Sequence, residues 1–177
     1  MAWLIRNEEM KDVPAISDVI QAAFEREVMS DHQEHHLVER LRQTTDYIPE
    51  LAYVATMEDG TIVGHVMFSR AHVVHANGTR TRVLALAPVS VLPHYQRQGI
   101  GRALIEQGLA DAVQLGFTSV IVLGHPSYYT TFGFKPAHHF GITPPFDVPE
   151  DAFMALPLKN DALKNIKGMV QYSDAFV

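Results

Sequence analysis

The chain has 177 residues, 47% of them hydrophobic, as expected for one globular domain with its own core. Its 14 basic and 20 acidic side chains give a net charge of -6, which disfavours nonspecific binding to nucleic-acid phosphates or an anionic membrane and mildly favours a cationic substrate. No apolar run reaches the roughly 18 residues of a membrane span, and the first residues lack the basic-then-apolar layout of a signal peptide. The absence of cysteine excludes disulfides and thiolate metal sites. We therefore expect a single cytoplasmic domain over residues 1–177.

The first part of the chain predicts a strand followed by two helices. Residues 3–6 are typical of a short strand. Residues Asp12 to Phe24 repeat apolar side chains at helical spacing, so we expect a helix that buries one face. A second helix is expected at about 34–43.

Three strand-like runs follow, at residues 51–57, 62–74 and 82–91. The first two are separated by a turn that ends at Gly60, and Asn77-Gly78 before the third is a strong hairpin signal. Since such short turns join neighbouring antiparallel strands, we expect an antiparallel meander.

The pattern then changes to helical spacing from Gly99 to Leu115, and Gly116 ends the helix. Residues Ser119 to Leu123, apolar from Val120 on, are typical of a fully buried strand. The strand that ends near Val91 and the strand at 119–123 are joined by a crossover helix, and such a connection joins parallel strands of one sheet. The sequence therefore predicts an α/β fold with a mixed central sheet and flanking helices.

The remainder of the chain is rich in proline and in loop residues. We expect a further strand near Phe153 to Leu158. We expect residues Gly168 to Tyr172 to protrude, so that they could pair with the sheet edge of a second copy; the oligomeric state stays open, with a homodimer as one alternative.

The turn between the strand that ends near Val91 and the following helix has the features of an anion site. Gly99 and Gly101 let successive backbone N–H groups converge, and a helix start adds unsatisfied donors and the positive end of its dipole. Arg97 and Arg102 add full positive charge. We predict that a phosphate or pyrophosphate binds here.

Two common phosphate motifs fit this turn poorly. A Walker-type loop needs Gly-Lys followed by Ser or Thr, but the chain has Gly101-Arg102-Ala103. A dinucleotide fingerprint needs a third small residue, where Leu104 stands, and an acidic residue about twenty positions on, near Ile121. An NAD- or ATP-using enzyme is thus the less favoured alternative.

The pattern Gln96-x-x-Gly99-x-Gly101 resembles the pyrophosphate loop of the GNAT acyltransferases, written Gln or Arg, two residues, Gly, one residue, then Gly or Ala. Residues Tyr128 to Phe134 resemble the aromatic segment that closes on Gly-Phe in that family. The sequences of the segments Leu86–Val91 and Gly124–Tyr129 further resemble the YhbS-like branch of predicted bacterial N-acetyltransferases. The resemblance covers nearly the whole chain and implies the GNAT fold.

The resemblance implies acetyl-CoA as co-substrate, no metal, and direct transfer of the acetyl group to a primary amine of a small molecule or protein in a ternary complex. A break in the strand near Pro88 would let the pantetheine arm pair with it. The cofactor-binding residues implied are Val89, Ser90, Val91, Arg97, Gln98, Gly99, Ile100, Gly101 and Arg102.

By the same resemblance, Tyr129 is the general acid that protonates the leaving thiolate, since a neutral phenol keeps its proton at pH 7. Many relatives carry a glutamate on the strand before the loop, but residues 83–87 hold no carboxylate. His72 and His125 are candidate proton relays. The missing carboxylate keeps open an alternative, a non-catalytic domain that binds acyl-CoA as a sensor or scaffold.

Two groups of histidines are further candidates, one for a metal site and one for contact with the acceptor. His32, His35 and His36 match no zinc motif, so a solvated helix face is the favoured interpretation. His138-His139 falls in a loop that would face either the acceptor or solvent.

Overall fold

The structure is a computed structural model that describes residues 3–176 and divides into two compact units. The first unit comprises residues up to Ser69 together with 87–111, and the second comprises 70–86 together with the residues from Ala112 onward. Two long strands, β3 (Ile62–Val74) and β4 (Arg80–Val91), contribute residues to both units.

The strands of the first unit are antiparallel. β1 (Trp3–Asn7) pairs with β2 (Tyr47–Met57) along its whole length, and β2 pairs in turn with β3. The pairing of β3 with β4 continues past the strand end, where Leu92 N–H donates to the Val63 carbonyl at 2.9 Å. The predicted meander is therefore confirmed.

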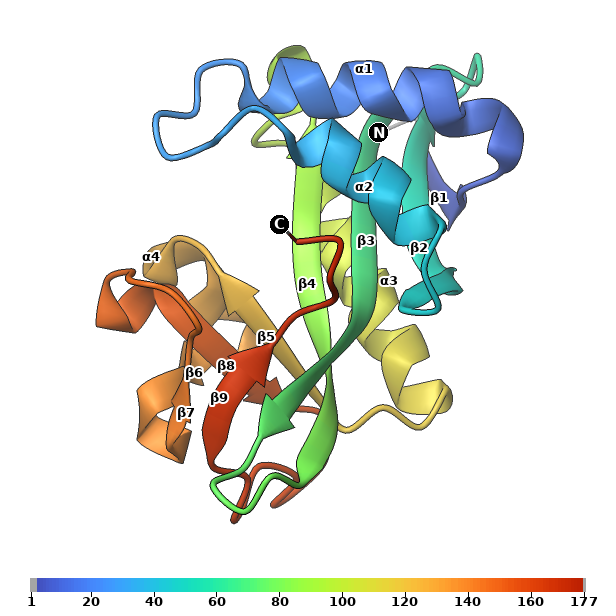
Figure 1. Cartoon of the computed structure of the whole chain (residues 1–177). Coiled ribbons are helices and arrows are strands. Elements are labelled where there is room, and N and C mark those ends of the chain that lie inside the picture. Colours follow the sequence, from blue (N-terminus) through green and yellow to red (C-terminus); the bar gives the residue numbers. More distant parts are fainter. Residues whose placement is uncertain (1–2, 177) are drawn as a thin grey trace. The chain divides into compact units, whose positions relative to one another are not determined.

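Helices α1 (Val13–Phe24) and α2 (Glu34–Arg42) form as the sequence predicts and lie across the strands of the first unit (Figure 1). A short 3-10 turn, η1 (Met10–Asp12), leads into α1, and Asp12 accepts a hydrogen bond from Glu9 N–H at 2.8 Å. Apolar residues recur three and four positions apart on one face of α1, which is the face that is buried. They are Ile16, Val19 and Ile20.

Alternation along β3 shows which helix covers which face in the first unit. A side chain at Gly64 would meet Ile100 and Leu104 of α3 (Ile100–Gln114), so that face lies against α3. The next residue, His65, points to the opposite face and bonds to Glu8, which Arg42 of α2 also contacts. Helices thus flank both faces of these strands.

In the second unit, β5 (Ser119–Leu123) pairs in parallel with β4 through Leu84↔Val120 and Ala85↔Ile121, which confirms the predicted crossover. β8 (Phe153–Pro157) pairs antiparallel with β5, and β6 (Lys135–Pro136) pairs with β8. Parallel and antiparallel pairs together make the mixed sheet. The core of this unit is built from Ala71, Val73, Val83, Ala85, Ile121, Ala137, Ile142, Phe153, Ala155, Leu163 and Val170.

The prediction for the C-terminal segment is wrong in one respect. Residues Gly168–Gln171 form strand β9, but β9 pairs antiparallel with β3 of the same chain, with His72 opposite Gln171. β7 (Ile142–Thr143) pairs in parallel on the other side of β9. This segment therefore fills a place in its own sheet and offers no protruding edge to a second copy.

Short helical turns connect the remaining elements. They are η2 (Pro93–Tyr95), α4 (Pro126–Tyr129), η3 (Thr130–Phe132), η4 (Ala137–Phe140) and η5 (Glu150–Ala152). In the part of the chain that the structure describes, no helix has the length and apolarity needed to cross a membrane.

Candidate active site

The turn that precedes α3 has the backbone geometry of an anion cradle. Arg97 has a φ of 62° and Gly99 a φ of 90°, so the chain twice enters the left-handed region between Gln96 and the helix. The bond from Ala103 N–H to the Gly99 carbonyl, at 3.0 Å, closes the first helical turn. The N–H groups of Ile100 and Gly101 precede that bond and lie at the positive end of the helix dipole.

Space is available in front of this turn. A Cβ added at Gly99 would meet no atom within 4 Å, so the backbone is open to a ligand at that point. The residues from Gln96 to Gly99 are exposed. Donors, charge and open space together fit a pyrophosphate group.

Side chains hold the turn in shape. Gln96 Nε2 donates to the Val91 carbonyl at 3.0 Å, and Gln98 Nε2 donates to the His94 carbonyl at 3.2 Å. Arg102 lies 3.8 Å from Glu106 one turn along α3 and remains partly exposed. The glutamines thus act on the loop backbone, while the arginine charges remain at the surface.

The strand residues that lead into the turn differ in exposure. Val89 and Val91 are partly buried, and Ser90 between them is buried. The Ser90 hydroxyl has no hydrogen-bond partner within the described chain. All the cofactor-binding residues predicted from the sequence, from Val89 to Arg102, belong to the first unit.

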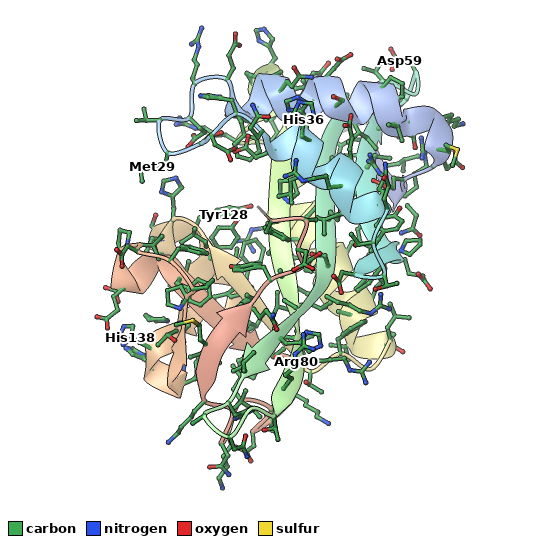
Figure 2. The ribbon with its side chains drawn as sticks, viewed as in Figure 1. Met29, His36, Asp59, Arg80, Tyr128 and His138 are labelled. Carbon is green, nitrogen blue, oxygen red and sulfur yellow. The ribbon has the colours of Figure 1, made fainter. Side chains whose placement is uncertain are left out.

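The predicted acid, Tyr129, is the last residue of α4 in the second unit. Its ring packs edge-on against Phe134 at 5.9 Å and against Tyr128 at 5.0 Å; Tyr128, labelled in Figure 2, is exposed. A Cβ at Gly124 would lie 2.4 Å from Tyr129 Cε2, so only glycine leaves room for the ring. Sequence inspection did not reveal this role of Gly124.

The environment of Tyr129 keeps its phenol protonated. Burial, with a smaller contribution from Tyr128, raises the pKa of Tyr129 above its usual value near 10. A neutral phenol is therefore present over the whole physiological pH range. That is the protonation state that a general acid needs before transfer.

The two histidines considered as relays lie in different surroundings. His72 Nδ1 accepts a hydrogen bond from Arg80 Nη2 at 3.0 Å, so that lone pair is already used. His125 is exposed, and its backbone carbonyl accepts the N–H groups of Tyr128 and Tyr129, both at 3.1 Å. The histidines near α2 form no metal cluster, since no group of three potential ligands occurs among residues 3–176.

The first unit also contains a buried charged network that sequence reasoning missed. Glu8 accepts hydrogen bonds from Arg42 Nε at 2.9 Å, Tyr47 Oη at 2.7 Å and His65 Nε2 at 2.8 Å. Glu8 directly follows β1, Arg42 ends α2, Tyr47 begins β2, and His65 lies in the first half of β3. No short motif joins positions so far apart, so only the fold brings them together.

This network fixes the protonation of its members. Burial opposes the charge of Glu8, but hydrogen bonds from His65, Arg42 and Tyr47 prevail and lower the pKa of Glu8 to about 2. His65 is fully buried, and burial lowers the pKa of its imidazole despite the neighbouring carboxylate. We conclude that neutral His65 donates from Nε2, which leaves Nδ1 as a buried acceptor without a partner in the described chain.

Comparison with known proteins identifies the family. The model of the acetyltransferase (GNAT) family matches residues 16–134. An uncharacterized N-acetyltransferase of Escherichia coli K12, YhbS, is 34% identical over 173 residues, which cover 98% of both chains. A second one from the same strain, YjhQ, is 36% identical over 120 residues, covering 67% of this chain and 65% of YjhQ.

Solved structures agree with this match. The crystal structure of E. coli YhbS in complex with CoA has a TM-score of 0.89 and 32% identity, covering 99% of this chain and 92% of that one. A GNAT acetyltransferase from Brucella melitensis in complex with acetyl-CoA has a TM-score of 0.81 and 31% identity, covering 99% and 98%. Since the family model, the full-length relatives and the mixed-sheet fold all agree, the chain belongs to the GNAT family of N-acetyltransferases and is YhbS-like.

Proposed function

We propose that this protein transfers the acetyl group of acetyl-CoA to a primary amine, on a small molecule or a protein, by direct attack in a ternary complex. Family membership supports the reaction class. The similar structures that contain CoA and acetyl-CoA support the co-substrate. The domain responsible is the whole chain, since the family match at 16–134 draws residues from both units.

The observation that carries the proposal is the turn before α3. The N–H groups between Arg97 and Arg102 hold the pyrophosphate of the co-substrate, and the two arginines balance its charge. The backbone of Val89, Ser90 and Val91 pairs with the amide-rich arm. The co-substrate, when bound, supplies the reactive thioester.

Tyr129 acts as general acid. It donates its phenolic proton to the sulfur as the amine nitrogen bonds to the acetyl carbon and the carbon–sulfur bond breaks. The proton that the attacking nitrogen then loses passes, directly or through water, to the tyrosinate and restores the phenol. The thiol that forms has a pKa near 8.5, so its thiolate is a weaker base than the tyrosinate. The phenol therefore stabilises the leaving group mainly while negative charge develops on the sulfur.

The acceptor must lose a proton before it attacks. For a lysine-like amine with a pKa near 10.4, the neutral form costs about 4.6 kcal/mol at pH 7. No carboxylate stands on β4 between Val83 and Ala87 to assist, and His72 Nδ1 is engaged by Arg80. Solvent water, reached directly or through His125, is the proposed acceptor of that proton.

The test is a panel of primary amines incubated with acetyl-CoA and purified protein, with release of CoA followed by a thiol-reactive dye. The chain has no cysteine, so the protein contributes no background to this assay. We expect release that depends on the amine and a matching acetylated product by mass spectrometry. Failure to bind CoA at millimolar concentration in calorimetry on folded protein would refute the proposal.

A second function is favoured by one specific observation, the absence of a carboxylate on β4 between Val83 and Ala87. A domain that binds acyl-CoA as a sensor or scaffold would bind acetyl-CoA without turnover on any amine. Binding with no product across the panel would favour this function over transfer.

A further inference from the structure

A cavity of about 460 Å³ in the second unit is distinct from the residues proposed to act in acetyl transfer. Its apolar lining residues are Phe140, Pro157 and Leu163, and its polar lining residues include His139, Lys164 and Lys167. One carboxylate, Asp161, also lines it, so the two lysines leave an excess of positive charge. A ligand with an apolar body and a negative group matches this combination.

The register of β8 on β5 shows where in the second unit this cavity lies. Leu123 pairs with Phe153 at one end, and Ser119 pairs with Pro157 at the other. Tyr129 follows Leu123 in the chain, whereas the cavity is lined by Pro157 and the turn segment after it. The cavity is therefore at the opposite end of β5, a strand roughly 13 Å long at about 3.3 Å per strand residue.

The apolar wall is already formed without a ligand. Leu163 is 3% exposed and belongs to the core of the second unit, and Phe140 packs against that core. The turn segment that carries Leu163 is fixed by hydrogen bonds, including Leu158 N–H to the Thr118 carbonyl at 2.8 Å and Ile166 N–H to the Leu163 carbonyl at 3.2 Å. A ligand would thus enter a site that needs no rearrangement of its floor.

The stem of Lys167 is also held in place. A Cβ at Gly141 would lie 2.9 Å from Lys167 Cγ and 3.3 Å from its Cδ, so the lysine side chain crosses directly over the glycine. Gly168 N–H donates to the Gly141 carbonyl at 3.1 Å and keeps the two segments together. Less side-chain freedom is lost when such a lysine binds an anion.

We propose that this cavity is a second ligand site, specific for a small organic anion with an apolar body such as an aromatic or branched aliphatic carboxylate. The carboxylate lies between the ammonium groups of Lys164 and Lys167, and the apolar body lies on Phe140, Pro157 and Leu163. This inference concerns a site apart from acetyl transfer and does not depend on the proposed function.

The test is a titration of isotopically labelled protein with benzoate, followed by NMR, with excess CoA present so that the turn before α3 is not the reporter. Saturable shifts are expected at the amides of Gly141 and Asn165. The double variant Lys164→Met, Lys167→Met should bind benzoate at least tenfold more weakly, because methionine keeps the apolar stem and removes the charge. Lys159→Met is the matched control, since Lys159 is exposed in the same turn segment but does not line the cavity.

Two further probes separate charge from apolar contact. Benzyl alcohol has the ring without the charge, and inorganic phosphate has charge without a ring, so both should bind more weakly than benzoate. The proposal is overturned if benzoate gives no saturable shift, if the double variant binds it like the wild type, or if either probe binds as tightly. None of these results would bear on CoA binding or acetyl transfer, which are measured separately.

Discussion

At the scale of single residues, Gly99 offers a sharp test of the pyrophosphate site, because the chain contains a matched control. Gly99 and Gly60 have φ values of 90° and 89°, and a Cβ at either position would meet nothing within 4 Å. Valine therefore introduces the same backbone strain at both sites.

Only at Gly99 does the new side chain occupy the space proposed for pyrophosphate. We expect Gly99→Val to abolish CoA binding in calorimetry, while Gly60→Val binds CoA like the wild type. Circular dichroism checks that both variants are folded. If folded Gly99→Val bound CoA with normal affinity, the proposal that pyrophosphate binds at this turn would be refuted.

Tyr129 is tested by removing one oxygen atom. Tyr129→Phe keeps the ring packing against Phe134 and Tyr128 but removes the proton donor. We expect turnover to fall by about 10² or more, with CoA affinity nearly unchanged, as for loss of a general acid. Turnover equal to that of the wild type would exclude Tyr129 from this role.

Gly124 is predicted to be a positioning residue for Tyr129. Gly124→Ala places a methyl group 2.4 Å from the unshifted Tyr129 Cε2, so the ring must move. We expect kcat to fall about tenfold or more with little change in KM for acetyl-CoA, since small misplacements of reacting groups are costly.

A double variant distinguishes this effect from general damage. In a Tyr129→Phe background the alanine should cause little further loss of kcat, because the group that it displaces no longer donates a proton. Losses that multiply in the double variant would show that Gly124 acts independently of the phenol.

At the scale of elements, sequence periodicity predicted the long elements well. The strand predicted at 62–74 is β3 without any shift, and the helix expected from Asp12 to Phe24 is α1 beginning at Val13. β2 begins at Tyr47, earlier than the predicted residue 51, because Pro49 and Glu50 break the apolar pattern but tolerate an extended backbone there. The local pattern of apolar residues is sufficient to predict the type and approximate bounds of an element when one of its faces is continuously buried.

Pairing between distant elements was predicted less well. The sequence suggests that residues 168–172 protrude and could pair with a second copy, whereas β9 pairs with β3 of the same chain. The Glu8 network and the room that Gly124 leaves for Tyr129 were missed for the same reason. These contacts depend on tertiary positions, whereas the turn proposed to bind pyrophosphate is contained in consecutive residues.

The packing of α3 on β3 in the first unit depends on another glycine. A Cβ at Gly108 would lie 2.1 Å from Phe68 Cε1 and 2.6 Å from its Cζ, and Phe68 is fully buried. Gly108→Ala should therefore destabilise the protein by about 1–3 kcal/mol through overpacking, reduced by the gain of about 1 kcal/mol in helix propensity.

The measurement is urea unfolding of the single variant and of Gly108→Ala combined with Phe68→Leu. The smaller side chain leaves room for the methyl group, so in the Phe68→Leu background the alanine should be neutral or stabilising. If Gly108→Ala stabilises the protein with Phe68 intact, the close approach of α3 to β3 is not a constraint on this position.

At the scale of the whole molecule, the Glu8 network links pH to global unfolding. Its members lie on four separate segments, so only the folded first unit brings them together. Glu8 has a folded pKa of about 2, below its unfolded value near 4.3, so its stabilising contribution is complete above pH 4.3 and is lost as pH falls toward 2. Between pH 5 and 7 the carboxylate is mostly ionised in both states and contributes only a small slope near pH 5.

His65 dominates the network's contribution in that pH window. Burial lowers its folded pKa below the unfolded value near 6.5, so on acidification the unfolded chain binds a proton at this position before the folded chain does. The free energy of unfolding should thus fall as pH decreases from about 6.5, by up to about 1.4 kcal/mol per pH unit from this residue. Urea unfolding at pH 7, 6 and 5 should show a smaller slope in His65→Gln than in the wild type, whatever its absolute stability. An unchanged slope in His65→Gln would mean that His65 is not held neutral by burial.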